Sequence, residues 1–291
     1  MSKKDIDDAT GIETTGHEWD GLKELNNPLP RWWLYILYAT IIWAIGYMIL
    51  YPSIPLINQG WPGVLGWSSR GDVAQELDGV AESRKAFDAR IAALSFDEIR
   101  ADPALFNYAQ RSGASAFKLV CSQCHGSGAV GDQELGYPNL NDDAWLWGGT
   151  MDAIYHTISH GVRNGVDPAA RNSVMPAYGT LGILTAAQIA DTAHHVLSLS
   201  GLDHDGAAAA RGTDIYMTQC AACHGPDGAG NPILGAPRLS DALWLYGASH
   251  AQVVAQISNP RLGVMPPWAE RFDEATRKKL AIYVHQLGGG Q

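Results

Sequence analysis

The chain has 291 residues and a formal net charge of −10, from 20 Lys and Arg against 30 Asp and Glu. That length gives room for about two domains with additional segments. The acidic balance argues against nucleic acid as a partner and favours a basic protein surface instead.

An apolar segment at residues 32–56 follows a polar tail at residues 1–31 and is long enough to cross a bilayer as a helix. No Asp, Glu, Lys or Arg occurs between Trp32 and Ser69, and aromatic residues at both ends suit the two membrane interfaces. A cleaved secretory signal is the alternative. The long polar tail before the segment and the lack of an A-x-A-like site after it argue against cleavage. We therefore expect one uncleaved transmembrane anchor, terminated by Pro52.

The distribution of basic residues predicts the orientation of this anchor. Lys23 and Arg31 precede it closely, whereas no basic residue follows it until Arg70. Basic flanks remain on the cytoplasmic side, so we expect a cytoplasmic N-terminus and a periplasmic remainder. A periplasmic spacer at residues 57–107, with a helical stretch at 73–94, is expected to pack on a partner or on the first domain.

Cys-x-x-Cys-His occurs twice and contains all four cysteines of the chain. The pattern is typical of c-type haem attachment, because two thiols one helical turn apart can add to the two vinyl groups of one porphyrin. The adjacent His then reaches the iron as proximal ligand. Zinc is one alternative, and a disulfide framework is another if haem is absent. We expect two covalently bound haem c groups, held by Cys121, Cys124 and His125 in the first copy and by Cys220, Cys223 and His224 in the second.

The residues around the two motifs repeat at an offset of 99 positions through to Ser159 and Ser258. The offset then falls to 90, so the first copy has nine extra residues between Ser159 and Val174. Each copy predicts a small helical domain, at residues 108–201 and 207–291, and no segment alternates with the strand period. The expected fold is all-α, with helices at 112–124, 150–160, 185–199, 210–223, 249–258 and 274–287 and with Thr185 and Asp273 as N-caps.

A haem iron in an electron carrier usually has a second axial ligand, and methionine in that position raises its potential. Met175 and Met265 are the methionines at equivalent places in both repeats, and each is followed by proline. We expect both to be axial ligands, with a core-filling role as the alternative.

Other residues leave alternatives open. Pro138 and Pro237 each follow a motif histidine by 13 positions, so their carbonyls could accept the imidazole N–H or the prolines could serve ordinary turns. His156 and His160 share one face of a predicted helix, a spacing that could bind metal or replace a methionine ligand. Neither has a counterpart in the second repeat, so we expect exposed or hydrogen-bonded side chains. No catalytic signature is found.

The stretch TTGHEWDGLKELNNPLPRWW at residues 14–33, the apolar segment after it and YPSIP at 51–55 resemble a known family. This family is the dihaem subunit III of cbb3-type cytochrome c oxidases, FixP/CcoP, and the resemblance covers nearly the whole chain. It implies two class-I-like cytochrome c domains and a non-catalytic electron-transfer role in a proton-pumping terminal oxidase of the bacterial inner membrane. The implied partners are a periplasmic c-type cytochrome donor, a monohaem subunit and a catalytic subunit with b-type haems and copper.

The resemblance also implies that Met175 and Met265 complete the iron sites, and it raises an exchanged arrangement in which each domain's methionine serves the other haem. Sequence spacing favours ligation within each domain, so the pairing stays open. The competing function is a membrane-anchored dihaem cytochrome c that serves another respiratory enzyme. A dihaem peroxidase would need one iron with a displaceable ligand, and a methionine in both repeats argues against it.

Overall fold

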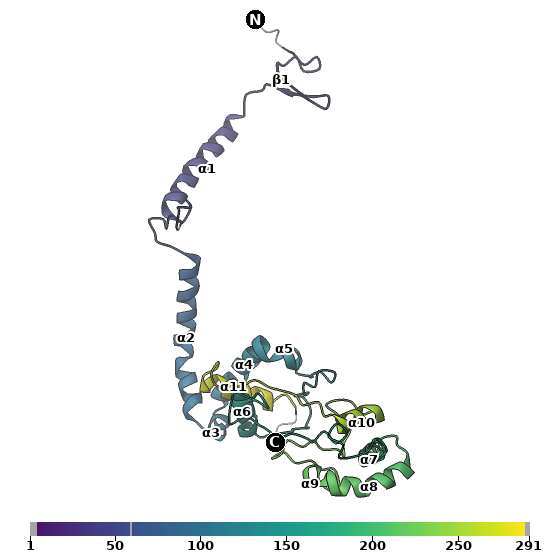
Figure 1. Cartoon of the computed structure of the whole chain (residues 1–291). Helices are drawn as coiled ribbons and strands as arrows, with labels where there is room; N and C mark the ends of the chain where they lie inside the picture. Colours follow the sequence, from purple (N-terminus) through teal and green to yellow (C-terminus); the bar gives the residue numbers. More distant parts are fainter. Residues whose placement is uncertain (1–4, 59, 289–291) are drawn as a thin grey trace. The chain divides into compact units, whose positions relative to one another are not determined.

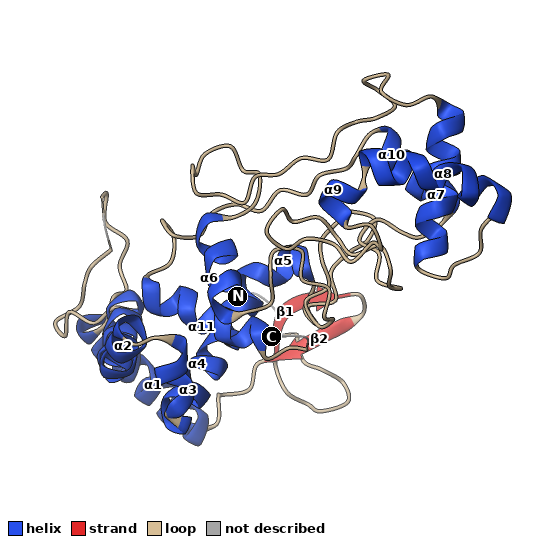
Figure 2. Cartoon of the chain, turned by 90° about the horizontal axis from the view of Figure 1, so that it is seen from below, coloured by secondary structure: helices blue, strands red, loops and turns tan. Residues whose placement is uncertain are grey.

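The computed structural model describes residues 5–58 and 60–288. It divides into two compact units, Met1–Ser83 and Arg84–Gln291. Figure 1 follows the elements along the chain, and Figure 2 shows that helices provide nearly all of the regular structure. The expected all-α class is confirmed, with one small addition in the first unit.

That addition is a β-hairpin, which the sequence analysis did not anticipate. Strand β1 (Thr14–Trp19) pairs with the antiparallel strand β2 (Leu22–Leu25) through a loop formed by Asp20 and Gly21. Both loop residues have positive φ, 49° and 85°, and Asp-Gly is a strong signal for such a two-residue turn. Only the first residue of β1 is buried, so the strands show no alternation of apolar and polar residues that would have revealed them.

Helix α1 (Arg31–Leu50) follows Pro30 and ends two residues before Pro52. None of its residues is buried, and it is the one helix in the described part of the chain that is long and apolar enough to cross a membrane. A helix that is apolar all round and contacts no protein core matches a membrane span. It is shorter than the predicted segment 32–56 because proline cannot continue the helix.

Helices connected by long loops form the second unit (Figure 2). Helix α2 (Ser69–Ala93) crosses the boundary between the units, so only its C-terminal part belongs here. The expected N-caps Thr185 and Asp273 accept hydrogen bonds from the backbone N–H groups of Gln188 and Thr276. The other elements are α3 (Phe96–Ala101), α4 (Pro103–Ala116), the π-helical turn η1 (Phe117–Cys121), α5 (Ser122–His125), α6 (Met151–His160), α7 (Ala186–Leu199), α8 (Gly206–Gln219), α9 (Ala221–His224), α10 (His250–Ser258) and α11 (Glu274–His285).

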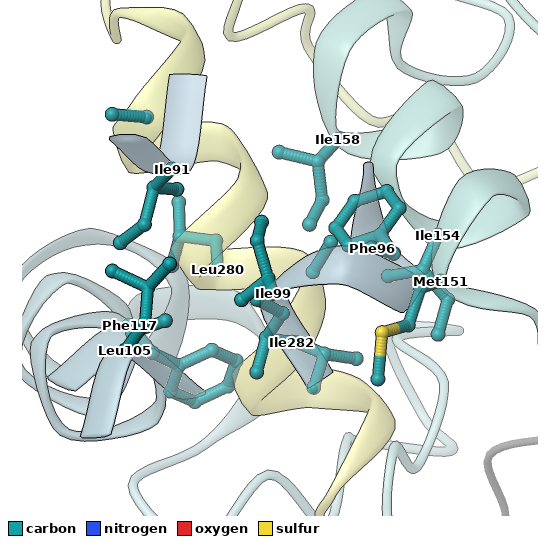
Figure 3. Packing of buried hydrophobic residues seen from close by; sticks show 14 of the residues in the cluster. Ile91, Phe96, Ile99, Leu105, Phe117, Met151, Ile154, Ile158, Leu280 and Ile282 are labelled. Atoms are coloured by element: carbon teal, nitrogen blue, oxygen red, sulfur yellow. The ribbon is translucent and has the colours of Figure 1, made fainter. Parts of the chain in front are cut away.

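The first core lies among α4, α6 and α11 (Figure 3). Ile158 of α6 and Leu280 of α11 are buried there, together with Ile91 from the end of α2 and Ile99 from α3. Ile91 and Ile99 are fully buried. The expected spacer covers residues 57–107, and its C-terminal part therefore packs into this first core, the second of the two expected alternatives.

Charged side chains fix α11 against the end of α2. Lys279 is buried, and its Nζ donates to the Asp88 carboxylate at 2.9 Å. The neighbouring Lys278 donates to the backbone carbonyls of Ala92 and Leu94 at 2.8 and 2.9 Å. A buried ammonium group without such partners would be strongly destabilising, so these contacts favour one position of α11.

The second core lies among α7, α8 and α10. Leu197 of α7, Tyr216 of α8 and Ile257 of α10 are buried in it. The Tyr216 hydroxyl donates to the carbonyl of Gly225, directly after the second Cys-x-x-CH motif, at 2.7 Å. This bond satisfies the buried hydroxyl and holds the motif against the core.

Each core combines helices from both sequence repeats. Helix α11 of the second repeat completes the core of α4 and α6, and helix α7 of the first repeat completes the core of α8 and α10. The sequence predicted that residues 108–201 and 207–291 would form separate domains, whereas their closing helices are exchanged. The long loops at residues 161–185 and 259–273 permit this exchange, because each can span from one core to the other.

The exchange predicts that α11 stabilises a core built mainly from the first repeat. Replacing Leu280, which is 1% exposed, with alanine should lower the free energy of unfolding by about 2–5 kcal/mol, because it leaves a cavity. Urea unfolding of the full chain in detergent, followed by helical circular dichroism, measures the change. Leu181→Ala is the control, since this side chain is 66% exposed. Equal losses in the two variants would contradict the packing of α11.

Candidate haem sites

Each Cys-x-x-CH motif lies where a long helix of its repeat continues into a short helix. Helix α4 passes through the wide turn η1 into α5, and α8 continues into α9. None of the four cysteines forms a disulfide; Cys121 is half-buried, Cys220 is buried, and Cys124 and Cys223 are exposed. In each motif one thiol is thus more buried than the other, and the two lie about one helical turn apart.

Burial raises the pKa of Cys121 and of Cys220 to about 11 each, with a smaller contribution from the neighbouring motif cysteine. Both thiols are therefore protonated at neutral pH. Addition of a thiol across a vinyl group forms a thioether and transfers the sulfur proton to carbon. The donor set fits a porphyrin with two vinyl groups.

Each motif histidine has a fixed ring orientation. The Nδ1–H group of His125 donates to the Pro138 carbonyl at 3.2 Å, and that of His224 donates to the Pro237 carbonyl at 3.0 Å. Burial lowers the pKa of both imidazoles, although the bond to the proline carbonyl opposes this effect. A neutral imidazole with its proton on Nδ1 keeps the Nε2 lone pair for a metal ion. The prolines thus accept the imidazole N–H, the first of the two alternatives.

An apolar cavity opens beside the first motif. Cys121, Cys124 and His125 line one part of it, and Met265 and Trp268 of the second repeat line another. The methionine that follows the second motif in sequence therefore shares a cavity with the first motif. A soft thioether sulfur in apolar surroundings is suited to haem iron.

The reciprocal arrangement is found at the second motif. Met175 of the first repeat packs against the core that contains Cys220. The hydroxyl of Tyr178, three residues later, donates to the Gln219 carbonyl at 2.7 Å. This bond joins the loop of Met175 to the residue before the second motif.

Backbone hydrogen bonds hold both methionine loops in this exchanged position. Val162 and Met265 bond to each other through both of their N–H and carbonyl groups, at 2.9 and 3.0 Å. The Ser159 carbonyl at the end of α6 accepts from the N–H of Trp268, and the Ser258 carbonyl at the end of α10 accepts from that of Gly179. Each loop is therefore anchored on the middle helix of the other repeat.

Two glycines allow aromatic rings to cross between the repeats. A β-carbon on Gly235 would lie 2.3 Å from the ring of Trp147, and one on Gly136 would lie 2.2 Å from the ring of Tyr246. Both glycines also have positive φ. Because these contacts are equivalent in the two repeats, the exchanged arrangement has approximate two-fold symmetry. Sequence spacing alone missed them, although the repeated glycines and aromatic residues were a signal.

The nine-residue insertion of the first repeat forms a loop, and the two histidines before it lie near its start. The His156 and His160 rings are 4.7 Å apart, and His160 Nδ1 contacts the Asp167 carboxylate at 2.9 Å. The bond from His160 lowers the pKa of Asp167. Neither histidine lines the cavity of the first motif. His160 is hydrogen-bonded, as expected, whereas the Nδ1 of His156 is buried without a hydrogen-bond partner among the described residues.

Helices that end in Cys-x-x-CH, proximal imidazoles oriented by prolines and methionines facing the motifs define a c-type cytochrome. Comparison with known families shows which kind of c-type cytochrome the chain resembles. The family "Cytochrome C oxidase, cbb3-type, subunit III" matches residues 109–196 and 207–284. The family "N-terminal domain of cytochrome oxidase-cbb3, FixP" matches residues 11–58.

Curated relatives agree along nearly the whole chain. The cbb3-type cytochrome c oxidase subunit FixP of Sinorhizobium medicae is 50% identical over 288 residues, which cover 99% of this chain and 98% of the relative. Subunit CcoP of Cereibacter sphaeroides is 49% identical over 278 residues, covering 96% and 95%. The chain belongs to the FixP/CcoP family of cbb3-type cytochrome c oxidase subunits, as the resemblance in its sequence implied.

The close contact between Gly235 and the ring of Trp147 yields a prediction with a matched control. Gly235→Ala should lower the free energy of unfolding by the strain of a side chain at φ +61° plus about 1–3 kcal/mol of overpacking against Trp147. Gly182→Ala places a methyl group at φ +67° with nothing within 4 Å, so it measures the backbone strain alone. Urea unfolding should show the larger loss in Gly235→Ala. Equal losses would mean that the ring does not press on this glycine.

Proposed function

We propose that this chain carries electrons as the dihaem cytochrome c subunit of a cbb3-type cytochrome c oxidase. The observation that carries the proposal is that Met265 lines the cavity of the first Cys-x-x-CH motif and Met175 packs on the core of the second. The near full-length identity to FixP and CcoP subunits supports the assignment to the oxidase. A bound haem supplies the one-electron couple of its iron, and the chain itself needs no catalytic residue for this role.

The proposed ligands divide between the repeats. The first haem would be held by Cys121 and Cys124, with His125 Nε2 on one side of the iron and Met265 on the other. This assignment is supported because all four residues line one cavity. The second haem would be held by Cys220, Cys223 and His224 with Met175, which packs against the same core as Cys220. The proline carbonyls would orient both imidazoles and increase their basicity.

The location of the chain follows from its anchor. Helix α1 provides a membrane anchor, in agreement with a subunit of a membrane complex. We place this anchor in the bacterial inner membrane with its N-terminus in the cytoplasm, because Lys23 and Arg31 precede it closely. The haem-binding unit would then lie in the periplasm, where c-type haem is attached.

The proposed partners are a periplasmic cytochrome c as donor and the other oxidase subunits, a monohaem cytochrome c and a catalytic subunit with b-type haems and copper. Residues 58–291 contain 16 Lys and Arg against 23 Asp and Glu. Such an acidic surface attracts a basic donor and repels an acidic one.

The pairing of ligands is tested with chains that carry one haem. In a Cys220→Ser/Cys223→Ser chain, Met265→Leu should abolish the sulfur-to-iron charge-transfer band of the remaining haem and lower its midpoint potential, because methionine ligation raises that potential. Met175→Leu should leave the band intact. Visible spectroscopy and a redox titration measure both effects.

The reciprocal chain, Cys121→Ser/Cys124→Ser, should show the opposite dependence on the two methionines. Loss of the band with Met175→Leu in the chain that retains Cys121 would establish ligation within each repeat. Retention of the band in every variant would mean that both methionines only fill the core.

Donor recognition is tested by ionic strength. Reduction of the full chain by a basic cytochrome c should slow by about tenfold or more between low and physiological salt, because salt screens the attraction. Stopped-flow spectroscopy gives the second-order rate constant. An uncharged small-molecule reductant is the control and should react at a rate independent of salt. If the two reductants behave alike, the acidic surface does not guide the donor.

A further inference from the structure

Arg163 lies in the insertion that is present only in the first repeat. Its Nε donates to the Gly263 carbonyl at 2.9 Å, and its Nη1 donates to the Ser173 carbonyl at 3.2 Å. Ser173 stands two residues before Met175, and Gly263 stands two residues before Met265. One guanidinium group therefore holds the equivalent carbonyls of both methionine loops.

The backbone of Arg163 is constrained as well. Its φ is +46°, one of few positive values among the described residues other than glycine. Such a conformation is unfavourable for a residue with a side chain and persists where the surroundings impose it. Neighbouring Val162 makes the paired backbone bonds with Met265, so the strained residue sits where the two loops meet.

The charge of Arg163 is placed in apolar surroundings. Among the described residues that line the cavity of the first motif, it has the only formally charged side chain. Both of its hydrogen-bond acceptors are neutral carbonyls. Burial lowers the pKa of Arg163, yet a guanidinium remains protonated in proteins at neutral pH. A permanent cation therefore stands beside the first haem cavity and on both methionine loops.

We propose that Arg163 is a positioning residue shared by both haems, which fixes the two axial methionines and places one positive charge near both irons. The inference rests on the methionine ligation proposed above. The planar fork of arginine can reach two carbonyls in different directions, whereas the compact ammonium of lysine cannot reproduce this geometry. A nearby cation favours the reduced state of each haem, because reduction removes a positive charge.

The test uses Arg163→Gln in each single-haem chain and exogenous imidazole, which competes with methionine for ferric iron. Loss of a charged hydrogen bond to each loop should let imidazole bind about tenfold or more tightly to both haems. Both midpoint potentials should fall. Arg163→Lys keeps the charge, so its potentials should fall less, while imidazole should bind as tightly as in Arg163→Gln.

Arg211→Gln is the matched control, because it removes the same charge from an exposed pair with Asp191. It should leave the imidazole affinity and the potential of each haem unchanged. An effect of Arg163→Gln on one haem only, or on neither, would overturn the shared role. Methionine ligation is checked first by the Met→Leu variants, so its failure is distinguished from a failure of the role assigned to Arg163.

Discussion

The reciprocal backbone bonds between the two methionine loops and the middle helices of the opposite repeats determine the rest of the haem-binding unit. Val162 forms backbone hydrogen bonds with Met265. Carbonyl groups at the ends of α6 and α10 accept hydrogen bonds from backbone N–H groups in the methionine loop of the other repeat. Once these loops cross, α7 and α11 must pack on the opposite cores. Met265 thereby lines the cavity of the first motif, and Met175 packs against the core that contains Cys220 of the second motif.

The residues that we propose for the haem sites could be named from the sequence because they stand in short spacings. Two thiols one turn apart, a histidine beside them and a repeated Met-Pro define a haem site without reference to the fold. Which of the two cores each closing helix would join was not predictable from the sequence. Leu197 of α7 and Leu280 of α11 lie on apolar faces with the same helical period, and such a face shows only that a helix is buried, not which core it joins.

Other features were missed because their signals are small or nonlocal. The hairpin of the tail depends on Asp20 and Gly21 and buries almost nothing, so hydrophobic patterning could not reveal it. Arg163 stood in an insertion that was interpreted as an ordinary loop, since its acceptors lie 10 and 100 positions away along the chain. Ile91 and Ile99 were assigned to a spacer because the polar residues around them dominate the composition of that segment.

The exchange also sets the order in which the haem-binding unit can mature. Ribosomes synthesise the chain from its N-terminus, so Cys121 and His125 are made long before Met265 and α11. The first cavity therefore stays open until the last helix arrives, while the second gains Met175 before its own motif is made. Contacts between residues so distant in sequence form slowly, because closing the long loop between them costs conformational entropy. The core beside the first motif is consequently completed only when α11 has been made, whereas α7, which completes the core of the second motif, is made before α8 and α10.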